Sequence, residues 1–248
     1  MITDPMYEQE NIKPYNKNKE KGPQVALMFD NIAHSYDFLN HFLSLGIDKI
    51  WRRKAIMGLR KLHPAKILDV ATGTADFAIL SSRLLHPQQV TGIDISEGML
   101  EVGRQKVEKL GIDNIVLEKG DCMYLAFDDG TFDAVTVAYG VRNFASLDQG
   151  LREICRVLKP GGRLVILELS RPEHFPMKQL FDIYSRVVMT FMGHLFSHDS
   201  SAYEYLPATM KVFPHSSEMR TILQKAGFRD VRSYKSLFDM NTRYEADK

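Results

Sequence analysis

The chain has 248 residues, of which 44% are hydrophobic and 25% are charged. This composition predicts a globular protein with a substantial core and excludes an intrinsically disordered chain. The formal net charge is only +1, so the sequence gives no reason to expect a nucleic acid as a partner.

The cysteines and the N-terminus indicate where the protein works. Cys122 and Cys155 are too few for a disulfide framework, which is typical of a reducing compartment. The first residues lack the apolar core of a signal peptide, and no later stretch is an uninterrupted apolar span of membrane length. We therefore expect a cytoplasmic protein.

The first part of the chain divides into a leader and a helical region. Residues 8–23 are rich in Lys, Asn and Glu, which predicts a flexible leader over residues 1–23. Residues 24–248 are expected to form a single domain. Apolar residues recur at helical spacing up to residue 62, so residues 24–62 are predicted to form a helical cap of two or three helices.

From residue 63 the pattern changes to apolar runs separated by amphipathic helices. The runs are KILDVA, QVTGIDI, NIVLEKGD, FDAVTVAYG, GRLVILELS and, near the C-terminus, VRSYKSLF. Helices are expected from about Asp76, over residues 97–110 and over residues 147–158. Short apolar strands joined by helices require parallel crossovers, so the pattern predicts an α/β fold with a doubly wound, mostly parallel sheet.

A small-residue loop follows the first apolar run. Asp69 ends the run, Gly73 allows a ligand to approach the backbone closely, and Thr74 offers a hydroxyl group. A dinucleotide fingerprint needs more glycines than the stretch TGTA provides, which disfavours NAD. The alternative is that Asp69 and Gly73 only end a strand and open a turn.

Acids also end the next two apolar runs. Asp94 ends the second run, where a carboxylate can accept both ribose hydroxyls of a nucleoside. The third run is followed by Asp121 and Cys122. The Asp121 side chain can accept from the amino group of an adenine, and the Cys122 backbone can contact the edge of the ring. No residue near Cys122 in the sequence marks it as an activated thiol. Together these positions predict an adenosine site, which suits either NAD or S-adenosylmethionine.

Several of these segments resemble a known superfamily. LDVATGTADFA, GIDISEGML, GDCMYLAF, FDAVTVAYGVRNF and LREICRVLKPGGRLVILELS resemble the class I S-adenosylmethionine-dependent methyltransferases. MFDNIAHSYDFLNHFLSLGIDKIWRR, YGVRN and DSSAYEYLPATM are similar to the demethylmenaquinone and ubiquinone C-methyltransferases, and the resemblance extends over roughly residues 25–235.

The resemblance implies a fold, a cofactor and a reaction. The fold would be a seven-stranded, Rossmann-like sheet, with residues 63–170 as the cofactor-binding core and 171–248 as substrate-side helices and last strands. The cofactor would be S-adenosylmethionine, and the reaction would convert demethylmenaquinol to menaquinol. C-methylation of a prenylated benzoquinol, or of another small or lipid-like acceptor, is the alternative.

Arg142 and Asn143 of YGVRN are the catalytic candidates. A cation or hydrogen-bond donor beside the phenolate of a quinol would stabilise charge that develops in the transition state. Arginine stays protonated, so Arg142 would bind the oxyanion or hold a water that takes the proton. The alternative is a salt bridge that fixes a loop. Tyr36, Asp37 and Asn40 are expected to close the site from the N-terminal helices.

Two places depart from the family pattern. Ala75 stands where the family usually has glycine, and Asp76 after it is either a first-turn acid or a contact to the methionine end of the cofactor. The tail carries Asp239, Asn241 and Arg243 where the family's last strand is usually small or apolar. The pairing and burial of the final strand therefore stay open.

The partners follow from a lipid-like acceptor. The resemblance implies a prenylated quinol substrate, a peripheral contact with the inner face of the membrane, and no nucleic acid; a homo-oligomer stays open. The apolar segment 177–196 favours core packing with one accessible face, and a prenyl groove or membrane contact is the alternative. His194 and His198 lie one helical turn apart with Asp199 next, but the glutamate of a zinc motif is missing and no metal is expected.

Overall fold

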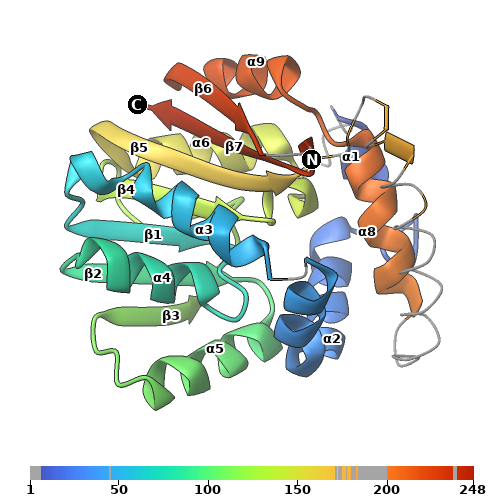
Figure 1. Ribbon diagram of the computed structural model, residues 1–248, viewed down its shortest axis with the longest axis horizontal. Coiled ribbons are helices and arrows are strands. Elements are labelled where there is room, and N and C mark those ends of the chain that lie inside the picture. The colour runs from blue at the N-terminus through green and yellow to red at the C-terminus, as the bar shows by residue number, and fades with distance from the viewer. Residues whose placement is uncertain are drawn as a thin grey trace.

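The computed structural model describes residues 7–44, 46–170, 200–236 and 239–248, together with residues 172, 175, 176, 178, 179 and 183. Strands and helices alternate from residue 66 to residue 119, and further strands and helices follow up to residue 247 (Figure 1). The helices are α1 (Glu8–Asn11), α2 (Lys21–Leu43), α3 (Asp48–Met57), η1 (Arg60–Leu62), α4 (Asp76–Leu85), α5 (Glu97–Lys109), η2 (Val141–Asn143), α6 (Leu147–Val157), α8 (Ser200–Val212) and α9 (Ser217–Lys225). The strands are β1 (Lys66–Val70), β2 (Gln89–Asp94), β3 (Ile115–Lys119), β4 (Phe132–Ala138), β5 (Leu158–Leu169), β6 (Arg229–Lys235) and β7 (Asn241–Asp247).

The strands form one sheet in the order β3-β2-β1-β4-β5-β7-β6. The first five strands of this order are parallel to their neighbours, whereas β7 is antiparallel to both β5 and β6. This is the doubly wound, mostly parallel, seven-stranded sheet expected from the sequence. The chain leaves β1 toward β2 and β3 and then returns to β4, so the strand order reverses beside β1. In doubly wound sheets, ligands bind at such a switch point, outside the carboxyl ends of the strands.

Each face of the sheet has its own core because neighbouring residues of a strand point to opposite sides. Leu68 of β1 belongs to a buried cluster with α6 and α9, whereas Ile67 belongs to a second cluster with α3 and α4. The strands buried on both faces therefore appear in the sequence as continuous apolar runs. In Figure 1, α3 and α4 lie in front of the sheet.

The helices begin close to the predicted positions. The sequence predicts helices from about Asp76, over 97–110 and over 147–158, and the structure confirms them as α4, α5 and α6. Ser96 and Ser146 precede α5 and α6, and each side chain accepts a hydrogen bond from a backbone N–H of the first turn. Such N-caps fix where a helix starts.

Residues 7–23, the described part of the expected leader, are held against the domain. The Tyr7 hydroxyl donates to Asp148 Oδ1 at 2.9 Å, and the backbone N–H of Leu147 donates to Glu10 Oε1 at 2.8 Å. Both partners lie in the first turn of α6, so α1 covers the beginning of that helix. The low hydrophobicity that suggested a flexible leader is offset by these long-range polar contacts, which composition does not reveal.

The polar tail forms an interior strand. β7 lies between β5 and β6, and Asn241 at its start is buried. Asn241 Nδ2 donates to the Tyr139 hydroxyl at 3.3 Å, and Arg163 pairs with Asp247 at the other end. The segment VRSYKSLF, which the sequence predicts as the last strand, overlaps β6, and β6 lies at the edge of the sheet. The segment 177–196 and the pair His194 and His198 with Asp199 lie outside the described residues, apart from 178, 179 and 183.

Candidate active site

Three acids predicted to bind the cofactor lie at or just after the carboxyl ends of adjacent strands. Asp69 lies near the end of β1, Asp94 ends β2, and Asp121 follows β3. Because β1, β2 and β3 are neighbours in the parallel sheet, the three residues lie along one edge. The structure therefore brings together the positions that the sequence places in one site.

Asp69 braces the turn that follows β1. Its carboxylate accepts hydrogen bonds from Thr72 Oγ1 and Thr136 Oγ1, both at 2.6 Å. The side chain is buried, and desolvation raises the pKa of Asp69 to about 6 although both hydroxyls act to lower it. Asp69 thus holds the 71–75 turn in place through Thr72. A direct contact between Asp69 and a ligand stays a prediction.

Asp94 connects that turn to the beginning of α5. Gly73 N donates to Asp94 Oδ2 at 2.8 Å, and Ser96 N donates to Oδ1 at 2.9 Å. Burial raises the pKa of Asp94 to about 6, again against the effect of these backbone donors. Each carboxylate oxygen has a second lone pair with which it can accept from a further hydroxyl.

Gly73 leaves open space above the turn. Its φ is +56°, and a Cβ built on it would meet no atom of the described residues within 4 Å. Ala75 also has a left-handed backbone, with φ +66°, at the position where glycine was expected. A left-handed turn of this kind lets backbone N–H groups approach a ligand closely. The open space and the adjacent carboxylate of Asp94 together fit a nucleoside cofactor.

The Thr74 hydroxyl already forms a hydrogen bond with another side chain of the protein. This hydroxyl donates to Asp37 Oδ1 at 2.5 Å, and Lys106 Nζ lies 2.8 Å from Asp37 Oδ2 and forms an ion pair with Asp76. This cluster joins α2, α4, α5 and the turn, and the expectation that Asp37 closes the site from the N-terminal helices stays a prediction. Tyr36 lies on the same helix, and the side chain of Asn40 lies outside the described residues.

Asp121 and Cys122 form the next part of the edge. Asp121 is exposed, and its Oδ1 accepts from Met123 N at 2.9 Å. Burial raises the pKa of the Cys122 thiol well above its usual value, so the thiol stays protonated. A protonated thiol is a poor nucleophile. The position therefore suits a backbone contact, as the sequence indicates.

Arg142 and Asn143 lie in η2, just beyond β4. Arg142 is buried and forms an ion pair with Glu168 of β5, whose Oε2 also accepts from Arg142 N at 3.3 Å. The salt bridge that the sequence left open is therefore present. Arg142 Nε and Asn143 Oδ1 are nevertheless buried without a hydrogen-bond partner among the described residues.

More buried polar groups that lack a partner in the described part of the chain lie around η2, where α1, η2 and α8 touch one another. The Tyr205 hydroxyl of α8 and the side-chain amide of Gln9 in α1 have no hydrogen-bond partner in the part of the chain that the structure describes. Buried polar groups in proteins are normally bonded, so this junction is a candidate site for a polar ligand.

Lys21 joins two of these three elements. Its Nζ donates to the carbonyl oxygens of Gln9 at 2.7 Å and Arg142 at 3.3 Å. Desolvation lowers the pKa of Lys21 to about 7, with the charge of Arg142 acting in the same direction. Lys21, Glu168 and Tyr205 were not predicted from the sequence. Of these three residues only Glu168 has a signal in the sequence, because it is an acid within the apolar run GRLVILELS.

Metal-binding clusters and membrane-spanning helices are both absent from the described residues. No group of three or more His, Cys, Asp or Glu residues there could hold a metal ion. No helix in the described ranges is long and apolar enough to cross a membrane.

Solved structures share this fold, and a family model matches most of the length of this chain. A solved structure from Thermotoga maritima, described as a SAM-dependent methyltransferase, covers 90% of this chain and 99% of its own at 18% identity, with a TM-score of 0.62. The fold is therefore that of the class I methyltransferases. Residues 16–242 match the ubiE/COQ5 methyltransferase family, and the chain belongs to this family.

Named relatives in the family are closer. A Bacteroides fragilis protein named demethylmenaquinone methyltransferase is 54% identical over 98% of this chain and 99% of its own. A Geobacter sulfurreducens protein named ubiquinone/menaquinone biosynthesis C-methyltransferase UbiE is 42% identical over 92% of this chain and 90% of its own.

Proposed function

We propose that the protein transfers a methyl group from S-adenosylmethionine to a ring carbon of demethylmenaquinol and so forms menaquinol. The observation that carries the proposal is the position of two features at one sheet edge. The cradle formed by the 71–75 turn, Asp94 and Asp121 lies at the ends of β1 to β3, and a junction whose buried polar groups have no partner among the described residues lies beyond β4. The name of the Bacteroides fragilis relative supports this acceptor.

The cradle is proposed to hold the cofactor. Asp121 and the Cys122 backbone would contact the adenine, and Asp94 would accept from the ribose hydroxyls. Gly73 and Thr74 would line the part of the cofactor beyond the ribose, with Asp69 holding their turn in place. S-adenosylmethionine, when bound, supplies an electrophilic methyl group.

The junction of α1, η2 and α8 is proposed to hold the ring of the acceptor. The acceptor carbon forms a bond to the methyl group, the sulfur–methyl bond breaks with its electron pair going to sulfur, and the ring carbon loses its proton. Negative charge on the quinol oxygen makes that carbon nucleophilic. Arg142, with its Nε still unpaired, would stabilise that oxyanion or hold the water that takes the proton. Asn143 Oδ1 would accept from a hydroxyl of the ring.

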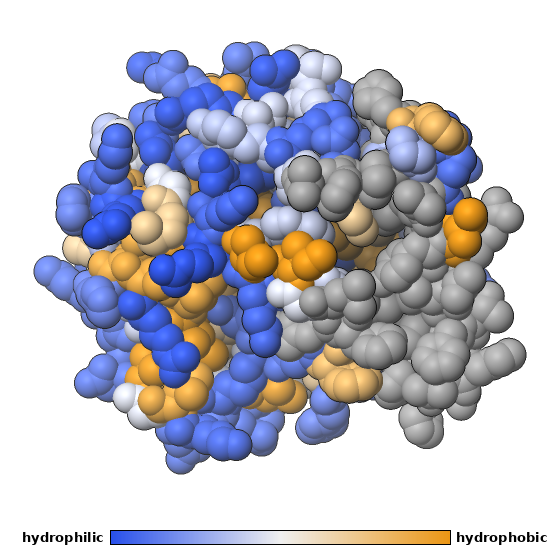
Figure 2. All heavy atoms as spheres, viewed as in Figure 1, coloured by the Kyte–Doolittle hydropathy of each residue, from blue (hydrophilic) through white to orange (hydrophobic). Residues whose placement is uncertain are grey.

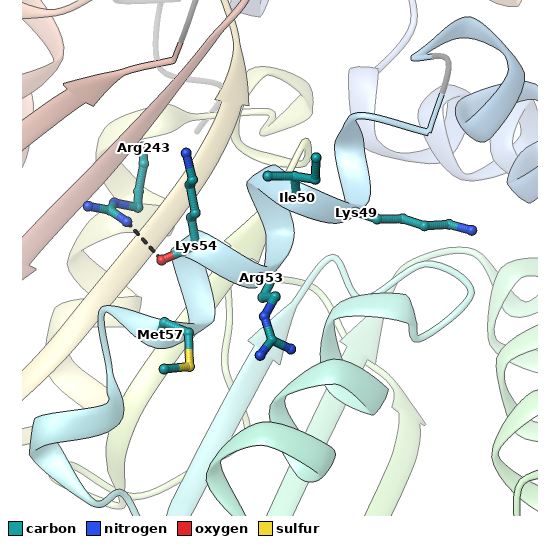
Figure 3. Close-up of a pocket in the computed structure, with 6 residues that line it drawn as sticks. All are labelled: Lys49, Ile50, Arg53, Lys54, Met57 and Arg243. Atoms are coloured by element: carbon teal, nitrogen blue, oxygen red, sulfur yellow. Dashed lines mark hydrogen bonds between the residues drawn. The ribbon is translucent and has the colours of Figure 1, made fainter.

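A peripheral membrane contact would bring the protein to a prenylated acceptor, and α3 offers a suitable surface. Lys49, Ile50, Arg53, Lys54 and Met57 of α3 and Arg243 of β7 line a pocket of about 490 Å³ (Figure 3). Figure 2 shows hydrophobic spheres over α3 with hydrophilic spheres on one side of them. Cations around exposed apolar side chains suit the anionic surface of a membrane.

Vesicle sedimentation tests this contact. We expect the triple variant Lys49→Gln, Arg53→Gln, Lys54→Gln to bind phosphatidylglycerol vesicles less than the unchanged protein. A control with three exposed lysines replaced elsewhere, at Lys109, Lys119 and Lys225, should bind as before. Equal binding by both triple variants would remove α3 from the proposal. Light scattering on the same samples gives the oligomeric state.

The acceptor is tested by direct assay. The protein is incubated with methyl-labelled S-adenosylmethionine and either reduced demethylmenaquinone or a reduced prenylated benzoquinone precursor, and the products are identified by mass spectrometry. We expect methylated naphthoquinol. The name of the Geobacter relative favours benzoquinol as the second candidate. No methylation of either acceptor by protein that binds S-adenosylmethionine would overturn the proposed reaction.

A further inference from the structure

One cation of α3 differs from the rest. Lys49, Arg53 and Lys54 are exposed on the outer side of the helix, whereas Arg52 is only 7% exposed. Arginine is almost never fully buried unless its charge is paired. The surroundings of Arg52 therefore require an explanation.

The interactions of Arg52 with the described residues are weak. Arg52 Nε lies 3.5 Å from Asp48 Oδ2 and has no hydrogen-bond partner among the described residues. Asp48 already accepts from the Ser44 hydroxyl at 2.7 Å. The guanidinium carbon lies 5.1 Å from the centre of the Tyr139 ring, within the range of a cation–π contact. This leaves a buried guanidinium with an unused donor.

Arg52 lies next to the proposed methyl-donor cradle. Tyr139 is the first residue after β4, beside β1 in the sheet. The charge of Arg52 acts to lower the pKa of Asp69, the residue that braces the 71–75 turn. Desolvation acts to lower the pKa of Arg52, but nearby charges, including those of Asp76 and Asp48, hold it above its usual value. Arg52 therefore stays charged at the edge formed by β1 and β4.

The order of the strands indicates which part of the methyl donor would reach Arg52. If adenine lies at β3 and ribose at β2, the amino-acid end extends over β1 toward the acceptor junction beyond β4. That end carries an ammonium group and a carboxylate. The acids Asp37 and Asp76 stand beside Thr74, where they can face an ammonium group, and Lys106 already pairs with them. The carboxylate needs a cation, and Arg52 is a buried one with an unused N–H.

We infer that Arg52 forms an anion subsite that binds the α-carboxylate at the amino-acid end of the methyl donor. A guanidinium group can bind a carboxylate through two parallel N–H bonds, which a lysine cannot reproduce. The inference rests on the proposed use of S-adenosylmethionine and adds the residue that recognises one end of it.

Calorimetry with two ligands tests the subsite. S-adenosylmethionine and its decarboxylated analogue differ only in the carboxylate. We expect the unchanged protein to bind the analogue at least about tenfold more weakly, as loss of a charged hydrogen-bonded pair implies. Arg52→Gln should weaken binding of S-adenosylmethionine by a similar factor and leave binding of the analogue within about twofold. Arg52→Lys should recover part of the difference.

The controls separate a binding role from a structural one. Arg229→Gln makes the same charge change at an exposed position on β6 and should alter neither affinity. Equal weakening of both ligands by Arg52→Gln, or equal affinity of the unchanged protein for both ligands, overturns the inference. The second measurement needs no variant, so it can overturn the inference even if Arg52→Gln does not fold, and Arg52→Lys then assigns the difference to Arg52. Failure of the unchanged protein to bind either ligand would instead overturn the proposed cofactor.

Discussion

Arg142 and Glu168 form an ion pair inside the protein, where β4 and β5 approach the proposed acceptor junction. The pair holds the guanidinium in one orientation and still leaves Arg142 Nε without a partner among the described residues. A cation fixed in this way needs no reorganisation when negative charge appears beside it during a reaction. The two roles that the sequence left open for Arg142, a salt bridge and a catalytic donor, are therefore compatible.

The stability of the pair can be separated from its catalytic role. Arg142→Ala should lower the free energy of unfolding by about 3–5 kcal/mol, because it leaves the Glu168 carboxylate buried without a partner. The double variant Arg142→Met, Glu168→Leu removes both charges and should recover part of that loss, the remainder being the backbone N–H groups of Arg142 and Leu169 that lose their acceptor. We expect its turnover to fall by about a hundredfold or more all the same. Near-normal single-turnover rates in the folded double variant would show that Arg142 is only structural.

Replacing Tyr205 is expected to weaken acceptor binding without lowering the stability of the protein. The Tyr205 hydroxyl is buried without a partner among the described residues, so Tyr205→Phe should keep or raise the melting temperature. If the hydroxyl binds the acceptor ring, KM for the quinol should rise by about tenfold while affinity for S-adenosylmethionine is unchanged. Tyr234→Phe, at a half-exposed position on β6, is the control and should change neither value. An unchanged KM in Tyr205→Phe would place the acceptor elsewhere.

Gly73 is expected to matter for the cofactor more than for the fold. Gly73→Ala should cost about 1 kcal/mol of stability through its positive φ, because left-handed backbone disfavours a Cβ. The new methyl group would project into the open space above the turn and weaken S-adenosylmethionine binding by at least about tenfold. Gly111→Ala has a similar φ of +61° and similar free space, but follows α5. It should lose the same stability and none of the affinity, and equal affinities in both variants would contradict the cradle.

The raised pKa of Asp94 predicts a pH dependence. Burial raises this pKa to about 6, above the value of about 3.9 in an unfolded chain, so the folded protein binds the proton more tightly. The stability gained from this protonation is fully present below about pH 4 and is lost as the pH rises through about 6. An ionised Asp94 is the form that accepts from ribose hydroxyls.

Affinity for S-adenosylmethionine should therefore fall as the pH drops from about 8 to about 5, with the change centred near the folded pKa. Calorimetry across this range measures it. In Asp94→Asn the affinity should be lower throughout and the pH dependence should be much reduced. The same slope in Asp94→Asn and in the unchanged protein would assign the titration to another group, such as Asp69, whose pKa is shifted in the same direction.

The positions of the cofactor acids could be predicted from the sequence because they depend on local patterns. Continuous apolar runs identify strands buried on both faces, and a polar residue that ends such a run must lie at the sheet edge. The sequence therefore predicts Asp69, Asp94 and Asp121 as neighbours at that edge, and the order of β1, β2 and β3 confirms it. Their contacts with a cofactor remain predictions.

The contacts between distant parts of the chain could not be predicted in this way. Lys21 bonds to the carbonyl of Arg142, Thr74 bonds to Asp37, and Arg52 lies on the ring of Tyr139. Each pair joins elements that are separated along the chain, and no short-range pattern reports which side chains will face one another. The polar composition of residues 7–23 likewise gave no sign that α1 packs on η2.

The sequence by itself determined the strands β1 to β6 and the helices α4, α5 and α6, since helix and strand periodicity and the capping residues act within a few positions. The tertiary structure alone decided that β7 lies between β5 and β6 and that Arg142 meets Glu168. The physical reason is that strand pairing and buried ion pairs are chosen by the packing of the whole chain. A polar strand such as Asn241–Asp247 becomes interior only because both of its neighbours supply backbone hydrogen bonds.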